Sequence, residues 1–240
     1  MINFKPIYSI NFDKTPRSLK DITYLIFHYT GMKSEKKAIQ RLTNKNSKVS
    51  CHYFIRRNGE ILNMVPDKFI AWHAGISCWK NHKNLNDKSI GIEIQNSGHS
   101  GKYERFSVKQ IKSLSFLAKI LKKRYHIKNK NFLGHSDIAP RRKKDPGEKF
   151  PWRYLAKQKI GIWHDLPENL KIRNAEVSIE EKKFFHSYLK KIGYCLKKKS
   201  KYSNSVIKAF QRRYRPKIIN GKIDKECFEI AKNLVKRGLN

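Results

Sequence analysis

The segment from Asp21 to Tyr29, which reads D-I-T-Y-L-I-F-H-Y, constrains the fold more than any other part of the chain. Its apolar and β-branched residues follow one another without a turn signal, which is typical of a buried strand. The apolar run ends in His28, so the strand would carry an imidazole to its end. The segment therefore predicts a sheet with other elements packed against it.

Further strand signals follow. Cys51 to Arg57 and Glu60 to Val65 flank Asn58-Gly59, a dipeptide that favours a tight hairpin turn because both residues tolerate a positive φ. Ser89 to Gln95 alternates, with isoleucines on one face and Glu93 on the other. One face of that strand is expected in the core, and Glu93 points elsewhere.

A long amphipathic helix is predicted next. Ser107 begins a capping box, and apolar residues then recur at helical spacing as far as Tyr125. Leu133-Gly134-His135 reads as a short strand and turn that delivers His135 to the edge of the sheet, near the loop that contains Asp145. Residues 1–168 are thus expected to form an α/β domain with a mixed central β-sheet flanked by helices.

Three short helical patterns fill residues 169–240 and predict a second domain, a small three-helix bundle. The first pattern is capped by Ser178 and stopped by Gly193, the second ends before Pro216, and the third opens at Asp224. About sixty residues of this kind are only marginally stable alone, so packing against the first domain is expected.

The composition is strongly basic, with 54 Lys and Arg against 19 Asp and Glu and a net charge of +35. Such a charge predicts attraction to polyanions: nucleic acid, an anionic membrane or a carboxylate-rich cell wall polymer. Nucleotide bias toward lysine codons explains the excess equally well. Aromatic residues at 12% and hydrophobic residues at 39% argue for a folded protein.

The cysteines and the apolar runs bear on the cellular compartment. Cys51, Cys78, Cys195 and Cys227 form no C-x-x-C pair, so free thiols are expected, with Cys51 and Cys78 buried. The first residues contain no apolar leader, and no apolar run approaches the about 18 residues of a membrane span. These features favour the cytoplasm, with the periplasm or cell envelope as the alternative if a leader was removed.

An imidazole, an ammonium group and a carboxylate occur close together in the sequence between Gly134 and Trp152, at His135, Lys143 and Asp145. With His28, two imidazoles and a carboxylate would leave zinc one open position, as in zinc hydrolases. Each residue also has an ordinary interpretation. A histidine that ends an apolar strand is usually a hydrogen-bonded core residue, and a lysine within a basic run usually faces solvent.

Six sequence blocks occur together in the first domain. They are Phe27-His28-Tyr29-Thr30, Ser50-Cys51-His52-Tyr53, Ala71-Trp72-His73-Ala74-Gly75, Ile90-Gly91-Ile92-Glu93, Gly134-His135-Ser136-Asp137-Ile138-Ala139-Pro140 and Lys143-Lys144-Asp145-Pro146-Gly147, followed by Phe150-Pro151-Trp152. Through these blocks the domain resembles zinc-dependent N-acetylmuramoyl-L-alanine amidases of the amidase-2 type, which are similar to peptidoglycan recognition proteins. Ala209-Phe210-Gln211-Arg212-Arg213-Tyr214 and Asn220-Gly221-Lys222-Ile223-Asp224 resemble a helical peptidoglycan-binding module.

This resemblance implies a site and a reaction. His28, His135 and Asp145 would bind one zinc ion, Glu93 would act as the acid-base group, and Lys143 would stabilise the transition state. The bond cleaved would be the amide between N-acetylmuramic acid and the first L-alanine of the stem peptide, in peptidoglycan or in its muropeptide fragments, during cell wall degradation or recycling.

Four more residues resemble positions that line a substrate groove: His52, Trp72, His73 and Asn96. The alternative is that Trp72 lies in the core and His52 packs behind the site. The remaining histidines match no block and are expected to be surface or structural residues; they are His82, His99, His126, His164 and His186.

Two other classes of function remain open. Some proteins of this kind bind wall fragments after losing a metal ligand, but all three ligand positions and Glu93 are present here. A nucleic-acid-binding protein is the other class, suggested by Lys197-Lys198-Lys199-Ser200-Lys201 and Arg212-Arg213, although no nucleic-acid motif accompanies them. The sequence leaves open the oligomeric state, the stem-peptide specificity, and the preference between intact sacculus and 1,6-anhydro fragments.

Overall fold

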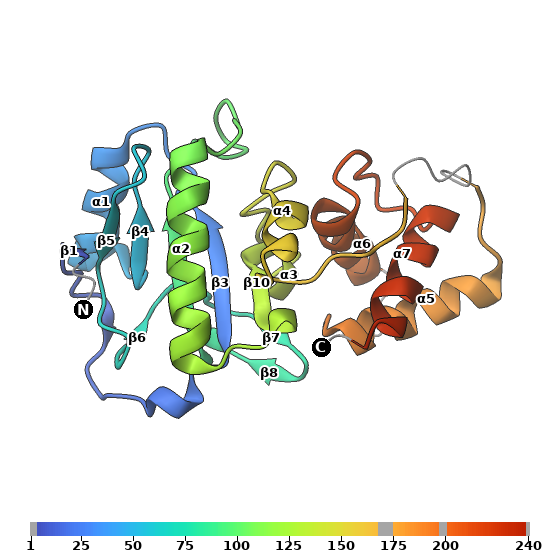
Figure 1. Ribbon diagram of the computed structural model, residues 1–240, viewed down its shortest axis with the longest axis horizontal. Coiled ribbons are helices and arrows are strands. Elements are labelled where there is room, and N and C mark those ends of the chain that lie inside the picture. Colours follow the sequence, from blue (N-terminus) through green and yellow to red (C-terminus); the bar gives the residue numbers. More distant parts are fainter. Residues whose placement is uncertain (1–3, 168–174, 197–200, 239–240) are drawn as a thin grey trace.

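The computed structural model describes residues 4–167, 175–196 and 201–238. In this part of the chain a six-stranded sheet with the order β1-β5-β4-β9-β3-β10 forms the centre of the N-terminal region (Figure 1). Neighbouring strands are parallel except β4 and β5, so the sheet is mixed, as the sequence predicted. The strands are β1 (Lys5–Pro6), β3 (Tyr24–Tyr29), β4 (Tyr53–Ile55), β5 (Ile61–Asn63), β9 (Ser89–Ile94) and β10 (Phe132–Gly134). Two small ribbons pair β2 (Phe12–Asp13) with β6 (Ile70–Ala71), and β7 (Cys78–Trp79) with β8 (His82–Lys83).

Helices surround the sheet and fill the C-terminal region. They are α1 (Glu35–Thr43), α2 (Val108–Tyr125), α3 (His135–Ile138), α4 (Trp152–Lys157), α5 (Ile179–Ile192), α6 (Lys201–Tyr214) and α7 (Lys225–Lys236), and short 3-10 turns cover Leu19–Asp21, Lys45–Ser47, Leu85–Lys88 and Asn129–Asn131. No helix in the described part of the chain combines the length and the apolar character that crossing a bilayer requires.

The local signals correspond closely to these elements. Ser107 caps α2 in a capping box with Gln110, and Ser178 caps α5 in the same way. Asp224 caps α7. One detail of the β4-β5 hairpin differs from the prediction, because Gly59 has a positive φ of 90° whereas Asn58 does not. The turn therefore uses the conformational freedom of the glycine alone.

The two faces of the sheet are covered by different elements. Leu25 and Phe27 of β3 pack with Leu114 and Leu117 of α2 on one face, in the apolar core beneath that helix. Ile26 lies on the opposite face. His28 follows Phe27 in the strand, so its side chain leaves the sheet on the side away from α2.

The C-terminal helices share a core with that second face. Ile26 of β3 and Leu133 of β10 belong to one apolar cluster with Phe185 of α5, Phe210 of α6 and Phe228 of α7. Figure 1 shows α3 and α4 between the sheet and this helical group. The packing expected between the two regions is present, and the predicted boundary at residues 168 and 169 lies outside the described residues. The two-domain division itself stays a prediction.

The expectation of free thiols was wrong for two cysteines. Cys78 of β7 and Cys195, which follows α5, form a disulfide across a sequence separation of 117 residues. Local spacing cannot reveal such a pair, because the fold alone brings the two residues together. Cys51 and Cys227 are buried free thiols, so the expectation for Cys51 is confirmed.

Candidate functional site

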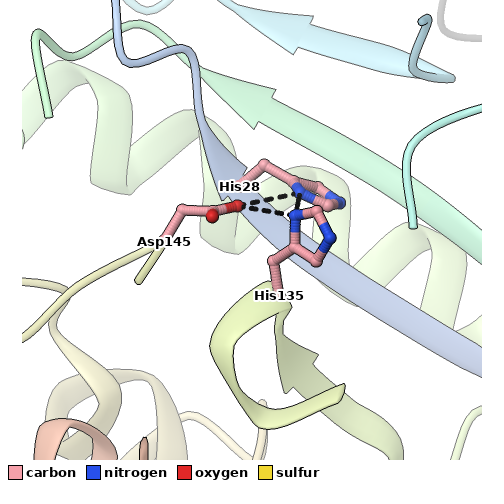
Figure 2. A group of neighbouring side chains, drawn as sticks. All are labelled: His28, His135 and Asp145. Atoms are coloured by element: carbon pink, nitrogen blue, oxygen red, sulfur yellow. Dashed lines mark hydrogen bonds and ion pairs between the residues drawn. The ribbon is translucent and has the colours of Figure 1, made fainter. Parts of the chain in front are cut away.

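The three predicted metal ligands converge at one end of the sheet (Figure 2). β3 and β10 are parallel neighbours with Phe27 opposite Gly134, so His28 and His135 leave the ends of adjacent strands. Asp145 reaches them from the loop after α3. His28 Nδ1 lies 2.9 Å from His135 Nδ1, and each of these nitrogens lies 3.0 Å from Asp145 Oδ2. All three side chains are buried.

Hydrogen bonds at the far side of each ring fix which nitrogen faces this point. His135 Nε2 lies 3.0 Å from the carbonyl oxygen of Ala74, which can only accept, so Nε2 carries a proton. In the neutral ring, Nδ1 of His135 then has a free lone pair. That lone pair points toward His28 and Asp145.

The orientation of His28 depends on two further side chains. The Ser89 hydroxyl donates to the Leu85 carbonyl at 2.6 Å, so it accepts from His73 Nε2 at 3.2 Å. His73 Nδ1 must then accept, and it lies 3.1 Å from His28 Nε2. His28 therefore carries its proton on Nε2 and presents the lone pair of Nδ1, as a metal-binding imidazole does.

Two imidazole nitrogens with free lone pairs and a carboxylate oxygen thus lie within about 3 Å of one another. The ligand atoms around a tetrahedral zinc ion are about 3.4 Å apart, which is a similar spacing. Electron-pair donors repel at this distance unless a cation lies among them. Burial and the neighbouring His135 lower the pKa of His28 to about 4, so its ring is neutral at pH 7. Two nitrogens and one oxygen are also ligands that zinc accepts, so the residues fit the ion.

Glu93 and Lys143 lie beside these ligands. Glu93 is paired with His28 across β9 and β3, so its carboxyl group leaves the sheet on the same face. Burial, with a smaller contribution from Asp145, raises the pKa of Glu93 to about 8, while the Lys143 charge opposes the rise. Among the described residues, Glu93 Oε2 has no hydrogen-bond partner, although it is buried. The carboxyl group is therefore free to exchange a proton near neutral pH.

A cavity of about 600 Å³ opens over this site. Glu93, His135, Lys143 and Asp145 form part of its lining. Three further cationic residues line it, Arg41 of α1 together with Arg142 and Lys144 of the loop after α3. The cavity can hold a ligand much larger than water, with carboxylates directed at these cations.

Residues 18–148 match the family model of the N-acetylmuramoyl-L-alanine amidases, which covers more than half of the chain. The chain belongs to this amidase family. It therefore acts as an N-acetylmuramoyl-L-alanine amidase, which hydrolyses the amide bond between N-acetylmuramic acid and L-alanine, and the enzyme predicted from the sequence is confirmed.

Relatives of this amidase cover between about two thirds and all of its length. The N-acetylmuramoyl-L-alanine amidase AmiD of Escherichia coli is 38% identical over 90% of this chain and 83% of AmiD. The 1,6-anhydro-N-acetylmuramyl-L-alanine amidase AmpD of Haemophilus influenzae is 34% identical over 65% of this chain and 92% of AmpD. Among solved structures, AmiD in complex with anhydro-N-acetylmuramic acid-L-Ala-D-gamma-Glu-L-Lys has a TM-score of 0.81 at 36% identity, covering 95% of this chain and 93% of AmiD. AmpDh3 of Pseudomonas aeruginosa has a TM-score of 0.80 at 30% identity, with both chains fully covered.

The four residues expected to line the substrate groove of the amidase fall into two pairs. Trp72 and His73 line the cavity, although His73 also contacts His28. His52 is buried, accepts from the Gly91 backbone and lies 2.9 Å from the Arg17 guanidinium. Asn96 is buried and uses both ends of its amide on nearby backbone, at Glu104 and Gly98. The structure places His52 and Asn96 behind the cavity, because their polar atoms are committed to internal hydrogen bonds.

Sequence reasoning missed other residues of the site. His99, expected to be surface or structural, lines the cavity, and its ring nitrogens lie 2.8 Å from the Tyr29 hydroxyl and 3.0 Å from Glu148. Gly91 is required for a different reason, since a Cβ there would lie 2.4 Å from Cγ of His73. The Ile90-Gly91-Ile92-Glu93 block contained this glycine, but only the fold shows which ring it accommodates.

Proposed function

We propose that this amidase binds one zinc ion at His28, His135 and Asp145 and uses Glu93 and Lys143 as its catalytic residues. A bound zinc ion would polarise the scissile carbonyl and acidify water. The observation that carries the proposal is the convergence of two imidazole lone pairs and a carboxylate oxygen, with the far nitrogen of each ring held by a hydrogen bond.

Glu93 moves the protons of the reaction in this proposal. A pKa raised to about 8 by burial allows the carboxyl group of the metal-free site to hold a proton at neutral pH. A carboxylate that accepts a proton from water can pass it to the departing amine of L-alanine, and this exchange is most effective when the pKa lies near the working pH. The glutamate then returns to its starting state.

Lys143 stabilises developing negative charge in this proposal. It lines the cavity with Asp145, and its ammonium group is near enough to Glu93 to oppose the rise in that residue's pKa. A fixed positive charge at the scissile carbonyl favours the transition state over the neutral substrate. Loss of Lys143 should therefore lower kcat more than it raises KM.

We further propose that soluble anhydromuropeptides are among the substrates. Solved structures show AmiD in complex with anhydro-N-acetylmuramic acid-L-Ala-D-gamma-Glu-L-Lys and AmpDh3 in complex with anhydromuramic pentapeptide. The wall of the cavity formed by Arg41, Arg142 and Lys144 suits the free carboxylates of such stem peptides. The C-terminal helices would then help to hold polymeric peptidoglycan, a role that the sequence predicts.

The compartment that we propose rests on the disulfide. The sequence favoured the cytoplasm, but a Cys78–Cys195 disulfide is expected to persist only in an oxidising environment. We therefore propose the periplasm or cell envelope. Labelling of free thiols in protein rapidly denatured inside cells tests this proposal: two protected cysteines support it, and four reactive cysteines contradict it.

One experiment tests the reaction and the roles together. Zinc content and mass spectrometry of muropeptide digests would be measured for the parent protein, Asp145→Ala and Glu93→Gln. The parent should contain one zinc and release intact stem peptide. Asp145→Ala should lose both properties, and Glu93→Gln should lose hydrolysis while keeping zinc. Full hydrolysis by Glu93→Gln would contradict the acid-base role.

A further inference from the structure

The helix that carries His135 is too short to hold its own conformation. α3 spans only His135–Ile138, and a single helical turn is unstable without outside contacts. Its backbone is tied to the third ligand, since Ser136 N donates to the Asp145 carbonyl at 2.8 Å. The position of His135 must therefore depend on the side chains that hold this turn.

Asp137 is the main anchor of α3. Its Oδ2 accepts from the backbone nitrogen of Gly134 at 2.8 Å, which closes the first turn of the helix. Both oxygens also accept from the C-terminal region: Oδ2 from Arg213 at 2.5 Å and Oδ1 from the Tyr194 hydroxyl at 2.7 Å. Asp137 and Arg213 are 1% and 2% exposed, so little solvent screens this ion pair.

Arg213 contacts residues on both sides of His135, one of the proposed metal ligands. One terminal nitrogen bonds to Asp137 in α3, and the other donates to the Phe132 carbonyl of β10 at 2.9 Å. His135 lies between these two residues in the sequence. The guanidinium group also lies over the Trp152 ring, 4.1 Å from its centre. A single planar side chain from α6 thus spans the strand and the turn on either side of His135.

Tyr194 is itself fixed to the N-terminal region. It forms an isolated β-bridge with Trp79, and the backbone nitrogen of Lys80 donates to the Gly193 carbonyl at 2.8 Å. The adjacent Cys195 forms the disulfide with Cys78. Burial and the Asp137 charge raise the pKa of Tyr194 well above its usual value, so its hydroxyl stays protonated and donates.

We propose that Arg213, assisted by Tyr194, is a positioning residue for the metal site, so that the C-terminal helices support catalysis by holding His135 in place. The inference rests on the metal site proposed above. It assigns to Arg213 a role other than wall binding or nucleic-acid binding, for which a buried guanidinium is unsuitable. Arg212 is also buried, at 8% exposure.

The chain offers a matched control in Arg215. It is buried to a similar degree, at 4% exposure, and its ion pairs are with residues at the start of α7, Asp224 at 3.0 Å and Glu226 at 3.5 Å. Arg213→Lys keeps the charge but replaces two terminal nitrogens in a planar fork with a single nitrogen, so it cannot reproduce the two hydrogen bonds to Phe132 and Asp137 in their present geometry. Arg215→Lys weakens an ion pair of the same kind elsewhere in the C-terminal helices.

The experiment measures the zinc dissociation constant by competition with a chelator at pH 7, together with the melting temperature of the metal-free proteins. Both variants should melt at a lower temperature than the parent. Arg213→Lys should weaken zinc binding by about tenfold or more, as loss of a residue supporting a metal ligand does, whereas Arg215→Lys should stay within about twofold of the parent. Equal zinc affinity for Arg213→Lys and Arg215→Lys would reduce Arg213 to a purely structural role.

Two further measurements keep the outcomes separate. If Arg213→Lys does not fold, Tyr194→Phe replaces it, since that variant removes one hydrogen bond to Asp137 and keeps the ring; a zinc affinity unchanged from the parent would then overturn the proposal. If the parent itself binds no zinc, the proposed metal site fails. If the parent binds zinc and every variant matches it, only the positioning role fails.

Discussion

Ser89 offers the sharpest test of how the metal site is built. It is completely buried, lies outside the cavity and contacts no predicted ligand, yet its hydroxyl orients His73, which in turn orients His28. Ser89→Ala removes the acceptor for His73 Nε2. His73 must then keep a buried, unpaired N–H, or move its proton to Nδ1, where it would face the N–H of His28.

The size of the effect follows from these alternatives. An unpaired buried donor costs about 1–3 kcal/mol of folding free energy. Changes to the partners of a ligating histidine typically weaken metal binding by about 10- to 100-fold, or about 1.4–2.7 kcal/mol. Since Ser89 acts on His28 only through His73, we expect the lower end, a zinc dissociation constant raised about tenfold.

The assay is chelator competition for zinc at pH 7, with Ser77→Ala as the matched control. Ser77 is also buried and also bonds to Leu85, by accepting from its backbone nitrogen at 3.0 Å, but within the described residues it forms no hydrogen bond with a histidine. Ser77→Ala should lose stability without losing zinc affinity. If both alanine variants bind zinc within twofold of the parent, the hydrogen bonds from Ser89 through His73 do not set the tautomer of His28, and the prediction is refuted.

Three other outcomes are expected. In the metal-free protein, Glu93 has a pKa of about 8 against an ordinary 4.5, so its contribution to stability is complete below pH 4.5 and is lost as pH rises through 8. In urea unfolding, the free energy of unfolding of Glu93→Gln should therefore rise relative to that of the parent between pH 5 and pH 8, by at most about 5 kcal/mol; parallel pH profiles would contradict this. Gly91→Ala places a Cβ 2.4 Å from Cγ of His73, so calorimetry should show a loss of about 1–3 kcal/mol together with weaker zinc binding, and a parent-like melting temperature would show that the ring moves freely. Replacing Cys78 and Cys195 by serine removes a cross-link over 117 residues and should lower the free energy of unfolding in denaturant by about 3–5 kcal/mol. A reductant should destabilise only the parent, and an equal response of the double variant would argue against the disulfide.

The sequence located the elements and the candidate metal ligands because their signals lie within short segments. An apolar run predicts β3, serine caps predict α2 and α5, and each operates within a few residues. The ligand set came from motif blocks, and the parallel pairing of β3 with β10 explains why His28 and His135 meet. The register of paired strands fixes which residues lie side by side, so a position in the sequence of each strand becomes a position in space.

The tertiary structure alone decided the contacts between distant segments. The Cys78–Cys195 disulfide, the Arg213–Asp137 ion pair and the burial of His52 have no sequence pattern, since a cysteine, a basic residue or a histidine reads the same whether it is buried or exposed. Their roles depend on which surfaces the apolar cores bring together. The sequence by itself therefore determined which residues can bind a metal, and packing of the C-terminal helices against the sheet determined what holds those residues in position.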